Sequence, residues 1–321
     1  MSFNQQKSNL QITIEKESLL SDNDILDIVL DKEQEMLETV EECFDGLINP
    51  VIFRGPPGTG KTMGINILSK KMGIKSTDLI ATEWTKPEEG GYPYDNGPIK
   101  TVDGALMRGA DYEPWALAAD LYGNRNGGAI VMDDNDEILK NMTAVAMLMD
   151  ATEQTAKKSV TYVKANTTHE LQMMGVEPVF DVQTPIVILS NIDMELHVRY
   201  AQDRENNGGP LMKSYLKRWA ALMSRGAYVD LQMNTPRSVR IFCEEKIKTV
   251  NMLTDSQFLE EKFGRSLTNS EADECMKWVR HNQGALSQPL DLRTYNKVAG
   301  IMLKRKSEWE KSAKVRLLQA I

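Results

Sequence analysis

The sequence predicts an α/β fold in which a mostly parallel β-sheet is covered by helices on both faces and is followed by a helical region. Two observations predict it. Short apolar runs that suit strands alternate with helical patterns as far as residue 235, and such alternation is typical of parallel sheets with crossover helices. From Pro236 onward, helical patterns continue without a further strand. We therefore expect an N-terminal extension over 1–30, a three-layer αβα domain over 31–235 and a helical domain over 236–321.

Apolar runs locate the expected strands. Residues 158–184 alternate locally between apolar and polar side chains and suggest a β-hairpin. The stretch 83–127 is rich in Gly, Pro and Tyr, and we expect it to be irregular. The five runs expected to form strands are 51–54, 79–82, 129–132, 185–189 and 227–231.

Apolar residues at helical spacing locate the expected helices. One is predicted to begin at Asp31, which would cap it, and to end at Asn49-Pro50. Others are expected over 60–72 and 138–152. The helical C-terminal region is expected to contain helices over 237–250, 255–263, 269–282 and 291–315.

The composition excludes several classes of function. A net charge of −8 argues against a generally basic surface that coats DNA, although a local basic channel stays open. The sequence has no run of about 18 apolar residues, so no membrane span is predicted. The N-terminal Met1–Gln6 lacks a signal-peptide pattern, and we expect a cytoplasmic protein. The three cysteines and three histidines fit no metal-binding spacing, so buried free thiols are expected.

A glycine-rich turn at Gly55-Pro56-Pro57-Gly58-Thr59-Gly60-Lys61-Thr62 follows the first strand. Its spacing is that of a Walker A phosphate-binding loop, with a strand before it and a helix after it. Glycines let the backbone approach phosphate closely, and successive N–H groups form an anion-binding nest. We expect Lys61 to reach the β- and γ-phosphates of ATP and the Thr62 hydroxyl to ligate Mg²⁺. The residues expected to bind the nucleotide are Pro57, Gly58, Thr59, Gly60, Lys61 and Thr62.

The strand at 129–132 runs into the acidic pair Asp133-Asp134, which fits a Walker B motif. Asp133 is expected to hold Mg²⁺, and Asp134 is expected to polarise the attacking water. Asp134 is one methylene shorter than the usual Glu, and the nearby Asp136 and Glu137 are alternatives for that role. A purely structural acidic loop that caps a helix is the other interpretation.

These motifs, in this order, resemble those of the AAA+ ATPases over roughly residues 30–310. The wording of the phosphate loop is one favoured in that superfamily, and Ile130 to Asp136 is similar to its strand-Asp-Glu-x-Asp segment. Three further segments resemble the sensor 1 strand, the arginine-finger segment and the sensor 2 helix, at Ile186 to Asp193, Leu222 to Gly226 and Asp291 to Tyr295.

The resemblance implies a role for one residue in each of these segments. Asn191 would hold the lytic water or the γ-phosphate, Arg225 would reach the ATP of a neighbouring subunit, and Arg293 would touch phosphate from a helical lid. The alternatives are that Asn191 caps a strand end, that Arg218 replaces Arg225, and that Arg293 pairs with Asp291 or another lid acid.

Within the superfamily the chain is similar to phage-encoded MoxR-like ATPases, through the run Gly127 to Asp134 and the segment Leu189-Ser190-Asn191. This implies a location in the cytoplasm of a bacterial host. An arginine finger supplied by a neighbour implies a homo-oligomeric ring, expected to be a hexamer, whose lid moves as ATP turns over. Tyr92 and Tyr94 follow the second expected strand and are candidates for gripping a polypeptide in the pore.

Three functions are consistent with these features. The first is an ATP-hydrolysing ring that remodels a protein complex, with a protein substrate favoured over DNA. The second is a DNA-directed motor or replication loader, for which Lys157, Lys158 and Lys164 of the expected hairpin are a weak signal. The third is a nucleotide-gated scaffold with little turnover, which the short Asp134 side chain would permit.

Overall fold

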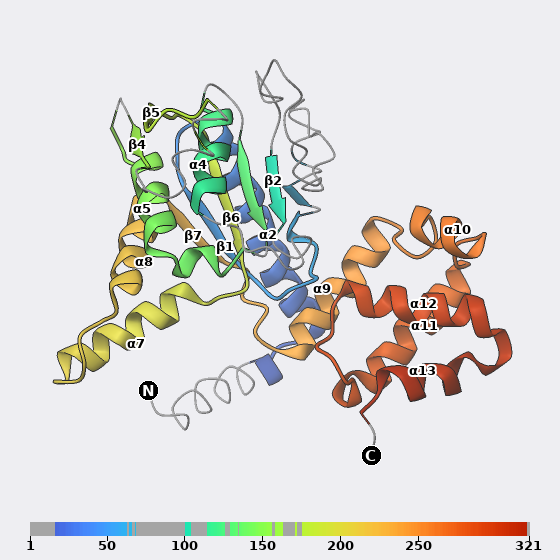
Figure 1. Cartoon of the computed structure of the whole chain (residues 1–321). Coiled ribbons are helices and arrows are strands. Elements are labelled where there is room, and N and C mark those ends of the chain that lie inside the picture. The colour runs from blue at the N-terminus through green and yellow to red at the C-terminus, as the bar shows by residue number, and fades with distance from the viewer. Residues whose placement is uncertain are drawn as a thin grey trace. The chain divides into compact units, whose positions relative to one another are not determined.

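The computed structural model describes most of the chain. The predicted strand at 79–82 lies outside the described residues. The described residues form two compact units. The first contains residues 33–55 and the described part of 61–231, and the second contains residues 17–32, 56–60 and 232–319. The described residues are 17–62, 64–65, 68, 100–103, 114–125, 129–133, 135–155, 158–162, 171 and 175–319 (Figure 1).

The first unit is built on a parallel sheet of five described strands. Every pairing between neighbours is parallel, so the carboxyl ends of the strands meet at one edge of the sheet. The three central strands are almost wholly buried, which explains their near-continuous apolar sequences. Four of the five predicted runs are confirmed as strands. In spatial order the strands are β2 (Lys100–Asp103), β3 (Ile130–Asp133), β6 (Ile186–Ser190), β1 (Val51–Arg54) and β7 (Ala227–Asp230).

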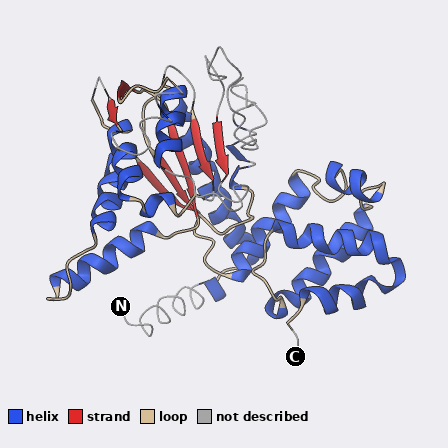
Figure 2. Ribbon diagram, in the orientation of Figure 1, coloured by secondary structure: helices blue, strands red, loops and turns tan. Residues whose placement is uncertain are grey.

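Helices cover both faces of this sheet (Figure 2). Ile52 and Ile188 belong to a buried cluster with α4 (Pro114–Gly123), α5 (Met142–Ala151) and α8 (Ser214–Arg225). The alternate residues Phe53 and Val187 are equally buried on the other face. The part of α2 (Asp22–Phe44) that belongs to the first unit, from Glu33 onward, runs along that side of the sheet in Figure 1. The predicted α/β class with helices on both faces is therefore confirmed.

Helix α2 begins nine residues earlier than predicted, at Asp22 rather than at Asp31. The reason is a reciprocal cap just before it. The Asp24 N–H donates to the Ser21 hydroxyl at 3.1 Å, and the Ser21 N–H donates to the Asp24 carboxylate at 2.8 Å. Asp31 is therefore an exposed residue within the helix and not its cap.

The stretch 83–127, predicted to be irregular, contains β2 and α4 among its described residues. Helix α4 is buried over most of its surface, so its sequence carries no polar stripe that would reveal a helical period. Strand β2 has the sequence Lys-Thr-Val-Asp, with a single apolar residue, and is the outermost of the strands that the structure describes. A prediction based on apolar periodicity therefore misses both elements.

The remaining elements of the first unit include a confirmed hairpin. Strands β4 (Ser159–Thr161) and β5 (Val179–Asp181) pair antiparallel, as the alternation over 158–184 predicted. The predicted helix at 138–152 is a short 3₁₀ turn, η1 (Ile138–Lys140), followed by α5. Helix α7 (Met194–Asn206) precedes α8, and both connect β6 to β7.

Besides the first part of α2, the described residues of the second unit form five helices. Three agree with the predicted ranges, but the single helix predicted over 291–315 is wrong. The helix is interrupted at Lys306, whose φ is 44°, and a 3₁₀ turn, η3 (Lys306–Glu308), separates two helices there. No Gly or Pro marks this break in the sequence. The helices are α9 (Pro236–Thr249), α10 (Gln257–Phe263), α11 (Asn269–Asn282), α12 (Leu292–Arg305) and α13 (Trp309–Leu317). Among the described residues, no helix combines the length and apolar character needed to cross a membrane.

Replacing Gly226 with alanine should destabilise the first unit severely. A Cβ atom at Gly226 would lie 1.7 Å from the backbone carbonyl oxygen of Pro50, and neither backbone can move without shifting β1 or β7. We expect a loss of at least about 2–3 kcal/mol in the free energy of unfolding, measured by urea denaturation. Gly284→Ala is the matched control, because a Cβ there meets nothing within 4 Å. Equal stability of the two variants would contradict the expectation.

Candidate nucleotide-binding site

The predicted phosphate loop joins the end of β1 to the helical residues Lys61 and Thr62. Gly58 and Gly60 have φ values of 69° and 86°, in the left-handed region that glycine tolerates best. Gly58 has a second constraint, because a Cβ atom there would lie 2.5 Å from a carboxylate oxygen of Asp291. The backbone thus has the local geometry that the glycines predicted.

Lys61 and Asn191 are brought together at the carboxyl edge of the sheet. The Lys61 ammonium is buried and donates to the carbonyl oxygen of Gly55 at 2.8 Å and to the amide oxygen of Asn191 at 3.2 Å. The sheet register explains the meeting, since Arg54 at the end of β1 lies beside Ser190 at the end of β6. The residues that follow β1 and β6 therefore lie next to each other.

Thr62 and Asp133 also meet at this edge. The Thr62 hydroxyl donates to the Asp133 carboxylate, which β3 carries at its last position. A hydroxyl oxygen and a carboxylate oxygen are hard ligands of the kind that Mg²⁺ prefers, so this pair of side chains fits a Mg²⁺ ion. Asp134, predicted to act on the attacking water, lies outside the described residues.

Asp136 has a role that the sequence did not reveal. Its carboxylate accepts a hydrogen bond from the Ser190 hydroxyl at 2.6 Å and from the Asn191 N–H at 3.4 Å. Asp136 therefore holds the end of β6 and positions Asn191. Glu137, the other suggested substitute for Asp134, pairs with Lys140 and has a side chain 82% exposed. In the sequence, only the closeness of Asp136 to the acidic pair marked it as a residue of interest.

A second feature missed in the sequence is an ion pair that joins the ends of β1 and β7. The Arg54 guanidinium donates to both carboxylate oxygens of Asp230, at 3.0 and 3.1 Å, and lies 4.0 Å from the Asp193 carboxylate. The register places Arg54 directly beside Asp230. Both hydrogen bonds come from the same guanidinium nitrogen, and this charge-assisted contact holds the strand end from which the phosphate loop begins.

Arg225 lies at the C-terminal end of α8, and its described contacts are with the region of α5. Its guanidinium donates to the carbonyl oxygen of Met149. Arg218, the alternative candidate, lies two turns earlier on α8 and donates to the carbonyl oxygen of Met142. Burial raises the pKa of the nearby Asp150 carboxyl, and the positive charges of the two arginines partly offset that rise. The contacts therefore do not distinguish the two arginines.

Arg293 lies in the first turn of α12, in the second unit. Asp291 caps that helix, because its carboxylate accepts from the Thr294 N–H at 2.8 Å and from the Thr294 hydroxyl at 2.9 Å. Arg293 forms no ion pair with Asp291 or with any other residue that the structure describes, so the pairing suggested as the alternative is not found.

A cavity of about 520 Å³ lies beside the first part of the phosphate loop, within the second unit. Its walls come from the loop itself, from the start of α9 and from the start of α12, where the Leu292 N–H donates to the Gly58 carbonyl oxygen at 3.0 Å. The volume lies in the range of small-molecule sites. Among its lining residues are Pro56, Pro57, Thr235, Pro236, Leu290 and Arg293.

Residues 50–198 match the family model described as an AAA domain of the dynein-related subfamily. This segment runs from just before β1 to within α7, and it includes Lys61, Thr62, Asp133 and Asn191. No curated protein matches the chain. The narrower resemblance to phage-encoded MoxR-like ATPases stays a prediction. Residues 50–198 are therefore similar to an AAA domain, and the parallel sheet with the phosphate loop at its carboxyl edge confirms the predicted α/β P-loop AAA+ fold.

Proposed function

We propose that the chain is a Mg²⁺-dependent ATPase that works as a ring-shaped homo-oligomer and remodels a protein complex. The observation that carries the ATPase part is the contact between the Thr62 hydroxyl and the Asp133 carboxylate beside the buried Lys61. A phosphate loop, a lysine and two hard oxygen ligands in one place are what Mg²⁺–ATP requires.

The roles follow from these positions. Lys61 would leave its contacts with Gly55 and Asn191 and bind the β- and γ-phosphates. Thr62 and Asp133 would hold Mg²⁺, which supplies positive charge to the phosphates when bound. Asn191, held by Asp136, would orient the attacking water, and we assign the activation of that water to Asp134.

The cavity beside the loop is our candidate for the base and sugar of the nucleotide. Its proline-rich walls offer flat apolar surface, and Arg293 offers a cation at the start of α12. We propose that residues 236–321 act as a lid over this nucleotide-binding domain, which extends from 31 to 235. Because the lid residues of this cavity and loop residues 56–57 line one space, nucleotide binding would bias the lid's position.

A protein substrate is favoured over DNA by charge, because the chain carries 46 acidic and 38 basic residues. Tyr92, Tyr94, Lys157 and Lys164, which bear on this choice, lie outside the described residues. A DNA-directed motor would require ATPase activity that rises with DNA and a mobility shift that weakens with salt. A scaffold with little turnover would require ATP-dependent assembly with negligible hydrolysis.

Replacing Asp133 with asparagine tests the ATPase assignment. The variant should lose the part of ATP affinity that depends on Mg²⁺ and should hydrolyse ATP at least about 100-fold more slowly. Calorimetric titration of ATP with Mg²⁺ and with a chelator measures the first effect, and phosphate release measures the second. Asp203→Asn, an exposed carboxylate on α7, is the matched control. Wild-type hydrolysis by the Asp133 variant would refute the assignment.

A further inference from the structure

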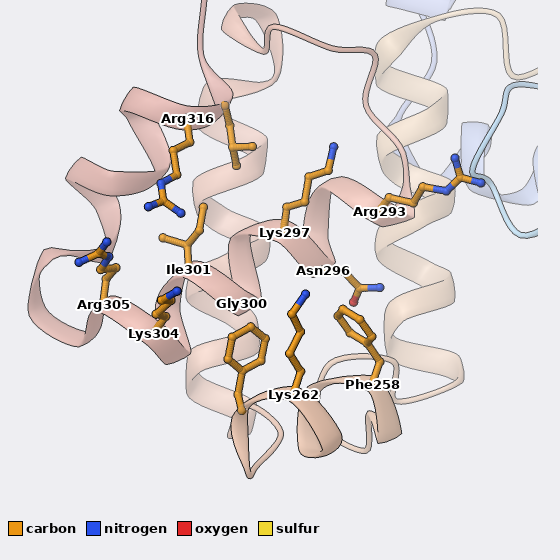
Figure 3. Close-up of a pocket in the computed structure, with 12 residues that line it drawn as sticks. Phe258, Lys262, Arg293, Asn296, Lys297, Gly300, Ile301, Lys304, Arg305 and Arg316 are labelled. Carbon is orange, nitrogen blue, oxygen red and sulfur yellow. The ribbon is translucent and has the colours of Figure 1, made fainter. Parts of the chain in front are cut away.

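A basic groove lies on the helical unit, away from the lining of the nucleotide cavity except at Arg293. It has a volume of about 590 Å³ and lies between α10 and the end of α13, with α12 as its floor (Figure 3). Gly300 and Ile301 are buried at its centre, and Phe263 packs over Gly300. Its cationic lining residues are Lys262, Arg293, Lys297, Lys304, Arg305 and Arg316.

The groove has an excess of positive charge that the described residues do not neutralise. None of its lining residues is acidic, and no ion pair among the described residues involves any of its six cations. All six cations are exposed. In Figure 3 the Arg293 side chain points away from Ile301, so the other five form the basic rim of an apolar floor. This rim is unusual in a chain whose net charge is −8.

The exposed side of α2 has the complementary pattern. Acidic residues recur there every three or four positions, which places them in one stripe along the helix. Ile28 lies within this stripe and is 41% exposed. Asp27 and Asp31 make no ion pair with any residue that the structure describes. The exposed acids of the stripe are Asp24, Asp27, Asp31, Glu35 and Glu38.

The two surfaces also match in spacing. Lys297 and Lys304 lie two helical turns apart on α12, which corresponds to about 10 Å. Asp24 and Asp31 have the same separation on α2, with the apolar Ile28 between them. A helix laid in the groove would therefore place acids over the rim and an isoleucine over the apolar floor.

We propose that the basic groove of one copy binds the acidic stripe of α2 from a second copy. The acids of the stripe and the cations of the rim are exposed, so both surfaces are available to a second copy. Two different surfaces of the same chain then meet, which is a heterologous contact that propagates around a ring. The inference rests on the proposed ring and names the surfaces that form it.

Single-stranded nucleic acid fits the groove less well. Phe258 and Phe263 would be the residues to stack on bases, but the Lys262 ammonium already lies 5.2 and 5.9 Å from the centres of their rings. An acidic helix needs no free aromatic face. The carboxylates of such a helix would neutralise the positive charges of the basic rim, and its apolar residues would pack on the apolar floor, as in other helix-in-groove complexes.

Charge reversal and its compensation test the contact. Lys297→Glu with Lys304→Glu should raise the protein concentration for half-assembly with Mg²⁺–ATP about tenfold, and Asp27→Lys with Asp31→Lys should do the same. A chain that carries all four changes should assemble at a lower concentration than either reversed chain, because the reversed residues again have opposite charges. Sedimentation velocity measures assembly, and circular dichroism checks that each variant is folded.

Lys311→Glu with Lys314→Glu is the matched control, because these lysines lie on α13 outside the groove lining and the variant has the same net charge. The proposal is overturned if either reversal alone assembles as the wild type does, or if the fourfold variant assembles no better than the reversed ones. Loss of single-stranded DNA binding with unchanged assembly would also overturn it. A wild-type chain that binds ATP yet stays monomeric would refute both the ring and this contact.

A cysteine crosslink gives a second measurement that does not depend on charge. The native Cys43, Cys243 and Cys275 are buried, so introduced surface cysteines react selectively. A chain with Asp31→Cys and Lys304→Cys should form covalent dimers and higher multimers with a short bifunctional thiol reagent. A chain with Asp31→Cys and Lys311→Cys should not, and equal crosslinking of the two chains would overturn the proposed contact.

Discussion

Replacing Lys61 with alanine should weaken ATP binding at least about 100-fold, which corresponds to roughly 2.7 kcal/mol. The Lys61 ammonium is buried at the carboxyl edge of the sheet, where it is held by the Gly55 carbonyl and the Asn191 amide oxygen. When ATP binds, Lys61 would exchange these two contacts for charge-assisted hydrogen bonds to the phosphates. Alanine removes the charge-assisted hydrogen bonds to phosphate and nothing nearby replaces them.

The measurement should use a slowly hydrolysed ATP analogue, so that lost binding is separated from lost turnover. Arg199→Ala is the control, since it removes an exposed cation that pairs with Glu195 on α7. The Lys61 variant must also unfold cooperatively at a midpoint close to that of the wild type. Analogue affinity within about threefold of the wild type in that folded variant would contradict the assigned role of Lys61.

The parts of this candidate site that could be predicted from the sequence are those formed by residues that are contiguous in the chain. The loop from Gly55 to Thr62 needs only its own glycines, lysine and threonine, and its conformation follows from them. The central strands were predictable because burial on both faces makes them apolar throughout. The positions of Asp133 and Asn191 were predictable because Asp133 ends one such strand and Asn191 follows another.

Other parts depend on contacts between residues that are distant in the sequence. The hydrogen bond from the Ser190 hydroxyl to the Asp136 carboxylate and the ion pair between Arg54 and Asp230 arise from the strand order, which no local pattern encodes. Helix α4 was missed because it is buried over most of its surface. The start of α2 was missed although Ile25 and Val29 begin its buried stripe directly after the cap. The break at Lys306 has no sequence marker.

Replacing Arg225 with alanine should lower the rate of ATP hydrolysis at least about 1,000-fold while ATP affinity changes little. A cation from a neighbouring subunit acts mainly on the transition state, where charge develops on the transferred phosphoryl group. The alternative finger, Arg218, supplies a closely matched control on the same helix. Both arginines donate to backbone carbonyls near α5, so truncating either should cost similar stability.

Mixing subunits decides whether the arginine acts on a neighbour. Arg225→Ala subunits keep Lys61, and Lys61→Ala subunits keep Arg225, so neither ring hydrolyses ATP alone. In randomly mixed rings about a quarter of the sites would pair an intact Lys61 with an intact Arg225 from the next subunit. Turnover should return to about that fraction of the wild-type rate. No recovery would mean that Arg225 does not act across the interface, and recovery with Arg218→Ala subunits instead would transfer the role to Arg218.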